Sequence, residues 1–469
     1  MKKTLLCIFS LLIIGSVSAQ TNLSGNVTGS LGPGNYHVIG DITLPNGGNL
    51  TISPGTNFEF DEDTAFLIHG LLTSSGAEGD SILFVKHSTA ADWDGLYFYG
   101  DSDDESMMEY CRISYAEPDT GRGGGVAVYS SNPTFNHCVF SENSTIEWGG
   151  GLFCASSNIS LSYCEFANNN AGFGGGLYCR ENSIVTIDHC LFVDNYATQR
   201  GGGIRVHTSS IANLTNCTIA GNSCGFRDSS GMQVYYANAV LTNCIVWGNY
   251  DGKGYQVTWS VVSGTIEWNY SCVESNVAVT ENGSFTEDPL FVGLSDYHVV
   301  RGSRAVDAGD PASGYSLEPE PNGDRINIGY YGGTSDATIS RVYKPQPFDN
   351  YVMRGIPVGV PDGDPTTLFA DDFNYSTPGL VNWRVSRWDI ANGKYVRYQG
   401  PDNPEVGGDQ DPPPFSPGLG FWVVQDIVHS CSLDVVETQM EGAVIQTFKY
   451  GVALEPPQNG NPGCNMMAN

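Results

Sequence analysis

Basic residues are scarce in this chain, which contains 21 Lys and Arg against 51 Asp and Glu, a formal net charge of −30 at pH 7. Charged residues of both signs make up only 15% of the sequence. A surface with this excess of negative charge repels the phosphates of nucleic acids and the anionic headgroups of membranes. The composition therefore argues against a nucleic-acid partner and favours solubility outside the cell.

Long hydrophobic runs are also lacking. The longest covers residues 5–14, and no later stretch approaches the 18 or more apolar residues that a transmembrane helix needs. This run follows two lysines and ends shortly before the small residues that precede Gln20, which is the pattern of a secretory signal peptide. We therefore predict a signal peptide over residues 1–19 and a mature chain that is secreted or lies at the cell surface.

Cysteine recurs every 26 to 28 residues through the middle of the chain. The members of this column are Cys111, Cys138, Cys164, Cys190, Cys217, Cys244 and Cys272. Asparagine keeps the same period five residues after the central cysteines, at Asn143, Asn169, Asn195, Asn222 and Asn249. Glycine triplets close at Gly125, Gly151, Gly176 and Gly203. A period of this size means that one short unit is stacked on copies of itself, so the sequence predicts a solenoid.

Apolar residues within each period alternate at the spacing of strands and never at that of a helix. The pairs after the glycines are predicted to point inward: Leu96/Phe98, Val126/Val128, Leu152/Cys154, Leu177/Cys179, Ile204/Val206 and Met232/Val234. Two further apolar groups per period complete three short strands and three bends. Because connections between parallel strands are right-handed, we predict an all-β fold, a right-handed parallel β-helix that is a single-stranded solenoid with three strands per coil. Its coils should lie about 4.8 Å apart.

The repeated columns have structural explanations. Glycine triplets suit corners with a positive φ or a close backbone approach, and no helix follows them to form a phosphate cradle. Stacked asparagines tolerate left-handed turns and hydrogen-bond from coil to coil. The cysteines are expected to be reduced, buried small hydrophobes, because parallel Cβ vectors one coil apart do not suit a disulfide. His137 and His189 share a column but lie two coils, about 10 Å, apart, so no metal site is predicted.

Three segments combine phenylalanine, asparagine, a small residue and glycines: FSENSTIEWGGGL from Phe140, FANNNAGFGGGL from Phe166 and FVDNYATQRGGGI from Phe192. This pattern resembles the repeats of the polymorphic outer membrane proteins over roughly residues 111–250. The resemblance implies export and a surface-exposed β-helix of the pectate-lyase-like kind.

The composition divides the chain after residue 19 into three parts. Residues 20–337 are predicted to form the β-helix, with capping coils at the start and a closing segment at the end, 338–349 a linker, and 350–469 a smaller, incomplete all-β domain. This domain resembles a module appended to exported bacterial surface proteins, and the segment GNPGCNMMAN suggests that it is truncated. In the closing segment Glu318, Glu320 and Asp324 are candidate calcium ligands, although a solvated loop is favoured and no cofactor is predicted.

The outer face of the strand after the glycines is where β-helix enzymes such as pectate lyases and polygalacturonases bind sugar chains. Nine residues that alternation places outward there are predicted to bind a glycan: Tyr97, Tyr99, Tyr129, Phe153, Tyr178, Arg180, Arg205, His207 and Tyr235. Aromatic rings stack on sugars, and guanidinium groups bind carboxylates or sulfates. Exposed tyrosines that only reflect strand propensity remain an alternative explanation.

Catalytic motifs are not found on this face. Its twelve outward positions are the nine residues above with Ala127, Ala155 and Gln233, and none is a carboxylate. Glycoside hydrolysis usually needs two carboxylates, so no catalytic residue is predicted. The leading hypothesis is a monomeric, non-enzymatic exported protein, an adhesin or glycan-binding structural module. The alternative is a lyase or hydrolase acting on an acidic polysaccharide. Acids clustered near the aromatic residues would favour it, for example Asp92 and Asp94 meeting Glu147 or Asp228.

Overall fold

The computed structural model describes residues 20–119, 121–226, 229–251, 258–275, 279, 281–293 and 295–340, and four strands between 352 and 425. The predicted signal peptide, and the predicted linker beyond residue 340, lie outside these ranges. In the described part of the chain no helix has the length and apolar character needed to cross a membrane.

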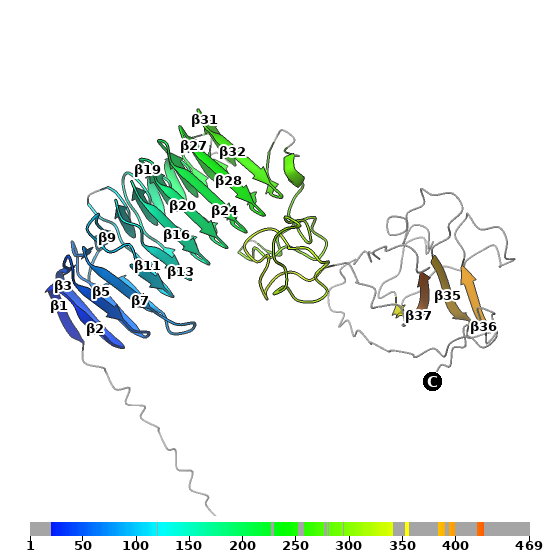
Figure 1. Ribbon diagram of the computed structural model, residues 1–469, viewed down its shortest axis with the longest axis horizontal. Helices are drawn as coiled ribbons and strands as arrows, with labels where there is room; N and C mark the ends of the chain where they lie inside the picture. Colours follow the sequence, from blue (N-terminus) through cyan, green and yellow to red (C-terminus); the bar gives the residue numbers. More distant parts are fainter. Residues whose placement is uncertain are drawn as a thin grey trace, which may run out of the picture. The chain divides into compact units, whose positions relative to one another are not determined.

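Short parallel strands stack into a β-solenoid with three faces (Figure 1). The first face contains β1 (Thr21–Asn26), β3 (Gly34–Leu44), β5 (Thr56–Phe60), β8 (Ile82–Lys86), β11 (Cys111–Ser114), β14 (Val139–Ser141), β17 (Glu165–Ala167), β21 (Leu191–Val193), β25 (Thr218–Ala220), β29 (Ile245–Trp247) and β33 (Cys272–Val273). The second face contains the end of β3, β6 (Ala65–Ile68), β9 (Gly95–Phe98), β12 (Val126–Tyr129), β15 (Leu152–Ala155), β19 (Leu177–Arg180), β23 (Ile204–His207), β27 (Met232–Tyr235) and β31 (Trp259–Val262). The third face contains β2 (Gly29–Leu31), β4 (Asn49–Ile52), β7 (Leu71–Ser75), β10 (Met107–Glu109), β13 (Thr134–Asn136), β16 (Asn158–Ser162), β20 (Ile184–Asp188), β24 (Ile211–Thr215), β28 (Asn238–Thr242) and β32 (Thr265–Asn269).

The core runs along the interior of this solenoid as columns of like residues. All six predicted pairs after the glycines are buried, as are the described members of the cysteine column. Phe140, Phe166 and Phe192 stack with ring centroids 4.5 and 4.6 Å apart. The buried cysteines are free thiols, and burial raises the pKa of Cys164 and Cys217. The predicted inside of the fold is therefore confirmed.

The asparagine column forms a continuous hydrogen-bonded ladder at a corner of the coil. Asn195 accepts from Nδ2 of Asn169 and donates from its own Nδ2 to Oδ1 of Asn222, both at 2.9 Å. The left-handed conformation expected at these asparagines is instead found one residue earlier, for example at Asn168 and Asp194. This corrects the prediction: the preceding residue makes the bend, which leaves the ladder side chain inside the coil.

The glycine triplets also form a corner, as predicted. Gly149 begins its triplet at a φ of +69°, which favours glycine. A Cβ on Gly150 would lie 2.4 Å from the carbonyl oxygen of Gly175 in the next coil. The first glycine is thus required by the turn and the second by the close backbone approach.

The middle coils contain a fourth short strand that the prediction of three strands per coil missed. These strands are β18 (Asn170–Phe173), β22 (Tyr196–Arg200), β26 (Ser223–Cys224) and β30 (Tyr250–Asp251), and they form a parallel sheet of their own. They lie in the connection between the asparagine ladder and the glycine triplet. Where several coils carry connections of similar length, their backbones pair with one another.

The two ends of the solenoid differ from its middle. Most residues of β1, in the first coil, are exposed. At the other end, the backbone N–H of Gly329 donates to Asn243, and Gly332 accepts from Asn216 and His189. Residues 329–332 therefore run back along the side of earlier coils. A single 3₁₀ turn, η1 (Glu281–Gly283), lies just after the last strand.

Four strands beyond the solenoid form an antiparallel sheet in the order β34-β37-β35-β36. They are β34 (Val352–Gly355), β35 (Trp383–Asp389), β36 (Lys394–Tyr398) and β37 (Gly420–Gln425). Each overlaps a segment that the sequence predicts to be a strand: YVMRGIPV from Tyr351, NWRVSRWD from Asn382, YVRYQG from Tyr395 and GLGFWVV from Gly418.

Candidate functional site

The nine predicted glycan-binding residues divide into two columns on the outer side of the second face. The first column is buried: the exposed fraction is 7% for Tyr97, 1% for Phe153, 2% for Tyr178 and 6% for Arg205. The second column is half-buried and contains Tyr99, Tyr129, Arg180, His207 and Tyr235. The expectation that all nine side chains are open to solvent is therefore wrong for the first column. Glycan binding by either column stays a prediction.

The chain that leads into each glycine triplet covers the first column. A Cβ on Gly174, the first glycine of its triplet, would lie 2.7 Å from Cβ of Tyr178. The residue before each such glycine lies over this outer surface. These four residues pair from coil to coil and are called the covering ladder: Arg122, Trp148, Phe173 and Arg200.

Trp148 is the most densely surrounded member of the covering ladder. Its indole is half-buried and stacks over Phe153 and Tyr178, with ring centroids 5.9 and 5.7 Å away. The guanidinium carbons of Arg122 and Arg180 lie 4.4 and 4.5 Å from its ring centroid. The buried rings and the two arginines together hold this indole in one place at the surface.

Phe173 is supported in a similar way one coil further on. The guanidinium carbon of the buried Arg205 lies 4.0 Å from the Phe173 ring centroid and 5.5 Å from that of Tyr178. Phe173 itself is half-buried. Arg205, predicted to contact a ligand directly, is instead placed beneath an aromatic side chain that is open to solvent on its remaining side.

The second column continues as stacks of rings along the solenoid axis. His69 stacks on Tyr99 at 4.6 Å, Tyr99 on Tyr129 at 6.2 Å, and His207 on Tyr235 at 5.0 Å. Because these rings face one another, a ligand would meet their edges and hydroxyl groups. The ring faces needed for sugar stacking are better offered by Trp148 and Phe173.

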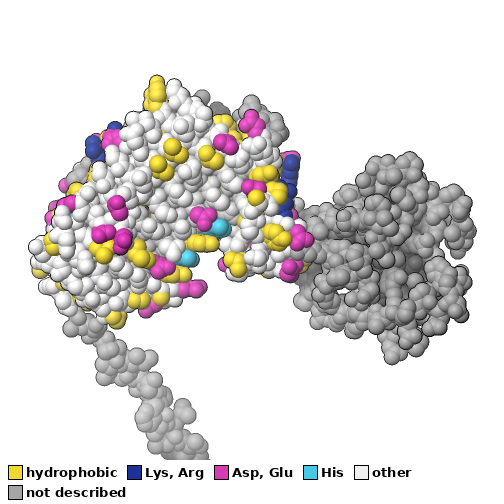
Figure 2. Space-filling model, in the orientation of Figure 1, with side chains coloured by type: hydrophobic (Ala, Val, Ile, Leu, Met, Phe, Trp, Pro, Cys, Tyr) yellow, Lys and Arg dark blue, Asp and Glu magenta, His cyan; other side chains and the backbone are white. Residues whose placement is uncertain are grey.

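Acidic residues offset the positive charge at this surface. Arg122 Nε lies 3.7 Å from Glu147 Oε2, and Arg180 Nη2 lies 2.7 Å from Glu181 Oε1. On the face drawn in Figure 2, acidic side chains are scattered over the described residues, and Lys and Arg are few. The covering ladder is therefore polar and aromatic without a strong excess of positive charge.

His207 is an uncharged member of this surface at neutral pH. Burial, together with the charges of Arg205 and Arg180, lowers its pKa from 6.5 to about 4. Its Nδ1 shares a hydrogen bond with the Thr208 hydroxyl. His207 therefore adds no positive charge to this surface at neutral pH.

The depressed pKa of His207 predicts a pH dependence of stability. As the pH falls from about 6.5 to about 4, the unfolded chain takes up the proton before the folded chain, so the free energy of unfolding decreases. The ring is half-exposed, and solvent screening reduces the expected loss to about 1 to 2 kcal/mol. Urea unfolding of wild type and His207→Gln at pH 7 and pH 4.5 should show a smaller pH effect in the variant. Equal pH effects would contradict the prediction.

Asp94, one of the acids expected near the aromatic residues, lies just before β9. Burial, then the charges of Asp63, Asp119 and Asp41, raise the pKa of Asp94. Asp41 also helps burial to raise the pKa of Tyr99. Asp94 is thus surrounded by other aspartates, whereas Asp228, one of its expected neighbours, lies outside the described residues.

The candidate calcium ligands are placed differently from one another. Glu318 is buried, and its Oε1 accepts hydrogen bonds from the backbone N–H groups of Asn327 and Gly333 at 2.7 Å. Burial raises the pKa of this carboxyl group. Glu320 and Asp324 are exposed. One carboxylate of the three therefore has a role inside its own loop, that of accepting backbone hydrogen bonds.

The covering ladder was missed by the sequence reasoning, but a signal was present. An aromatic residue or an arginine stands immediately before each glycine triplet, in the segments R-GGG, W-GGG, F-GGG and R-GGG. Alternation was counted only after the glycines, so the residues that fold back over the strand were not considered.

Comparison with known proteins supports the architecture. Residues 69–239 match a family model described as a right handed beta helix region. The fold is a right-handed parallel β-helix. No match is found among curated proteins or among solved structures. The matched residues include the covering ladder and all five residues of the second column.

Proposed function

We propose that this β-helix protein is an exported, non-enzymatic surface module, adhesin-like in role, that binds a polysaccharide or cell-surface glycan through the covering ladder. The observation that carries the proposal is the pair of half-buried rings, Trp148 and Phe173, supported from below by Tyr178 and Arg205. Rings fixed in this way lose little side-chain freedom when a sugar stacks on them. The signal-peptide pattern, and the resemblance to polymorphic outer membrane proteins and to a bacterial surface module, favour export.

The charges of the surface indicate the kind of glycan. Arg122 and Arg180 flank Trp148 but each also pairs with a glutamate. A carboxylate or sulfate on the sugar could exchange with these partners, at the cost of breaking exposed ion pairs that stabilise by less than about 1 kcal/mol. Weakly anionic or neutral chains therefore suit the ladder better than densely sulfated ones.

A glycan array with the mature chain, followed by titration of a bound oligosaccharide, tests this proposal. Trp148→Ala should weaken binding by about 1 to 2 kcal/mol, because it removes a stacking ring. Tyr163→Ala is a matched control, since Tyr163 is a half-buried tyrosine in a different stack, between His137 and His189. The control should bind normally. Equal losses in both variants, or none in Trp148→Ala, would place the site elsewhere.

A polysaccharide lyase or hydrolase remains the second candidate because of Asp94. A half-buried carboxyl group with a raised pKa suits a general acid, and Asp41, one of the aspartates that raise the pKa of Asp94, also acts on Tyr99. Analysis of the products from any bound glycan distinguishes the two functions. Cleavage that is lost in Asp94→Asn but retained in Asp101→Asn would support the enzyme, and intact glycan supports the binding module.

A further inference from the structure

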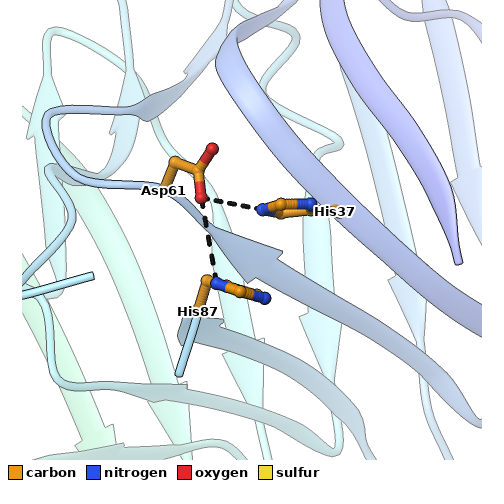
Figure 3. A group of neighbouring side chains, drawn as sticks. All are labelled: His37, Asp61 and His87. Atoms are coloured by element: carbon orange, nitrogen blue, oxygen red, sulfur yellow. Dashed lines mark hydrogen bonds and ion pairs between the residues drawn. The ribbon is translucent and has the colours of Figure 1, made fainter. Parts of the chain in front are cut away.

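Two histidines and an aspartate meet on the outer side of the second, third and fourth coils (Figure 3). His37 is in β3, while Asp61 and His87 directly follow β5 and β8. Phe60 pairs with Lys86 in the strand register, so Asp61 and His87 occupy the equivalent next position in adjacent coils. The parallel register therefore places Asp61 beside His87, 26 residues later, whereas His37 aligns with Glu59 and lies diagonally opposite Asp61, two positions along the strand.

The distances between these groups are short. Nε2 of His37 lies 2.7 Å from Oδ1 of Asp61, and Nδ1 of His87 lies 4.0 Å from the same oxygen. The two imidazole rings stack with centroids 4.3 Å apart. One candidate ligand atom from each of the three residues lies within 4.8 Å of the other two. All three residues are half-buried, with about a fifth of each histidine side chain exposed.

A second carboxylate supports the group from the neighbouring position. Glu59 Oε2 lies 3.8 Å from Nε2 of His87, and Glu59 is itself held by hydrogen bonds from Asn57 and Gln20. A carboxylate on the far nitrogen of a metal-binding histidine orients the ring and makes it a better ligand. With Glu59 near Nε2, Nδ1 of His87 is the nitrogen closer to Asp61, and a metal ion there would replace the hydrogen bond that Nδ1 shares with the Thr89 hydroxyl at 2.8 Å.

These donors select a class of ion. Imidazole nitrogens with one carboxylate oxygen suit zinc and similar transition metals, whereas calcium and magnesium prefer oxygen ligands throughout. Zinc bonds of about 2.0 to 2.2 Å require ligand atoms roughly 3.4 Å apart in a tetrahedron. His37 and Asp61 are closer than that and His87 is further away. Because an imidazole lone pair lies in the plane of its ring, the two stacked rings must also tilt apart, so the half-buried side chains rotate to complete the set.

We propose that His37, Asp61 and His87 bind one zinc-like divalent ion, which ties the second, third and fourth coils of the solenoid together. This tie lies next to the terminal coil, whose strand β1 is exposed along most of its length and lacks a neighbour on one side. The negative charge of the chain raises the local concentration of cations. A fourth coordination position remains for water.

Calorimetric titration of the untagged mature chain with zinc chloride tests the proposal. One ion should bind per chain, and His37→Ala and His87→Ala should each weaken binding at least tenfold. His69→Ala is the matched control, because His69 pairs with Asp101 at the same 2.7 Å distance but has no second histidine within reach of that carboxylate among the described residues. The control should bind zinc as the wild type does.

Thermal unfolding gives a readout that does not depend on the calorimetry. Saturating zinc should raise the unfolding midpoint of the wild type and of His69→Ala, but not that of the His37→Ala/His87→Ala double variant. Loss of both effects in the double variant supports the site. No binding by the wild type, or undiminished binding by the double variant, for example at cysteines, would overturn it.

Discussion

Replacing Cys190 by Asp is expected to lower the free energy of unfolding by about 4 kcal/mol or more, the largest effect of any single change considered for this fold. Cys190 has no exposed surface, and its Sγ lies 3.3 Å from the backbone N–H of Cys164 and from the backbone carbonyl oxygen of Asp188. A carboxylate there would be repelled by that carbonyl oxygen and would have apolar residues of the adjacent coils around it. Urea unfolding, with the slope compared between variants, measures the loss.

Cys190→Ala is the control for this prediction. It removes the sulfur and leaves a small cavity, but it buries no charge, so the expected loss is about 1 to 2 kcal/mol. If Cys190 lies in the interior, Cys190→Asp must lose much more unfolding free energy than Cys190→Ala. If Asp and Ala were equally tolerated, the column would have to be accessible to water.

The interior of the solenoid was predictable because every coil places the same kind of residue at the same position in the core. Each coil must present an apolar residue to the same place in the coil below, so a buried column appears in the sequence as a fixed period. Phe140, Phe166 and Phe192 keep that period and stack face to face. The strands β34 to β37 were predictable for a different reason: each overlaps an apolar run bounded by turn residues.

The outer side was harder to predict because alternation shows only which way a side chain points. It does not show whether another part of the chain lies on top. Tyr178 and Arg180 both point outward, yet the first is 2% exposed and the second half-buried. The difference arises from the turn before each glycine triplet, whose path depends on a positive φ and not on any apolar pattern.

The sequence contains only a weak indication that His37, Asp61 and His87 lie together, and the strand register is needed to interpret it. The spacings of 24 and 26 residues between His37, Asp61 and His87 are close to the later period, but no cysteine or asparagine column marks these coils. Moreover, His37 aligns with Glu59 in the register, and a longer β3 turns the corner here. Without knowledge of the strand register, the sequence does not show that the three side chains lie together.

Asn195→Leu is expected to lower the free energy of unfolding by about 3 to 5 kcal/mol, because the Asn195 side chain forms hydrogen bonds with both neighbouring coils. Asn195 is fully buried, and its Nδ2 donates to the backbone oxygen of Phe166 at 2.8 Å as well as to Asn222. Its Oδ1 accepts from both the backbone N–H and the Nδ2 of Asn169. Leucine fills a similar volume but leaves these buried donors and acceptors unpaired, each at a cost of about 1 to 3 kcal/mol.

The matched control for the ladder is Asn158→Leu, an exposed asparagine at the start of β16. Its side chain makes no ladder contact, so the expected change is within about 0.5 kcal/mol. Hydrogen exchange should then show where the lost stability lies: amides of the coils on both sides of Asn195 should exchange faster, while those of the first coils should be unchanged. Uniform acceleration along the whole solenoid would mean that the ladder acts on global unfolding and not on the stacking of neighbouring coils.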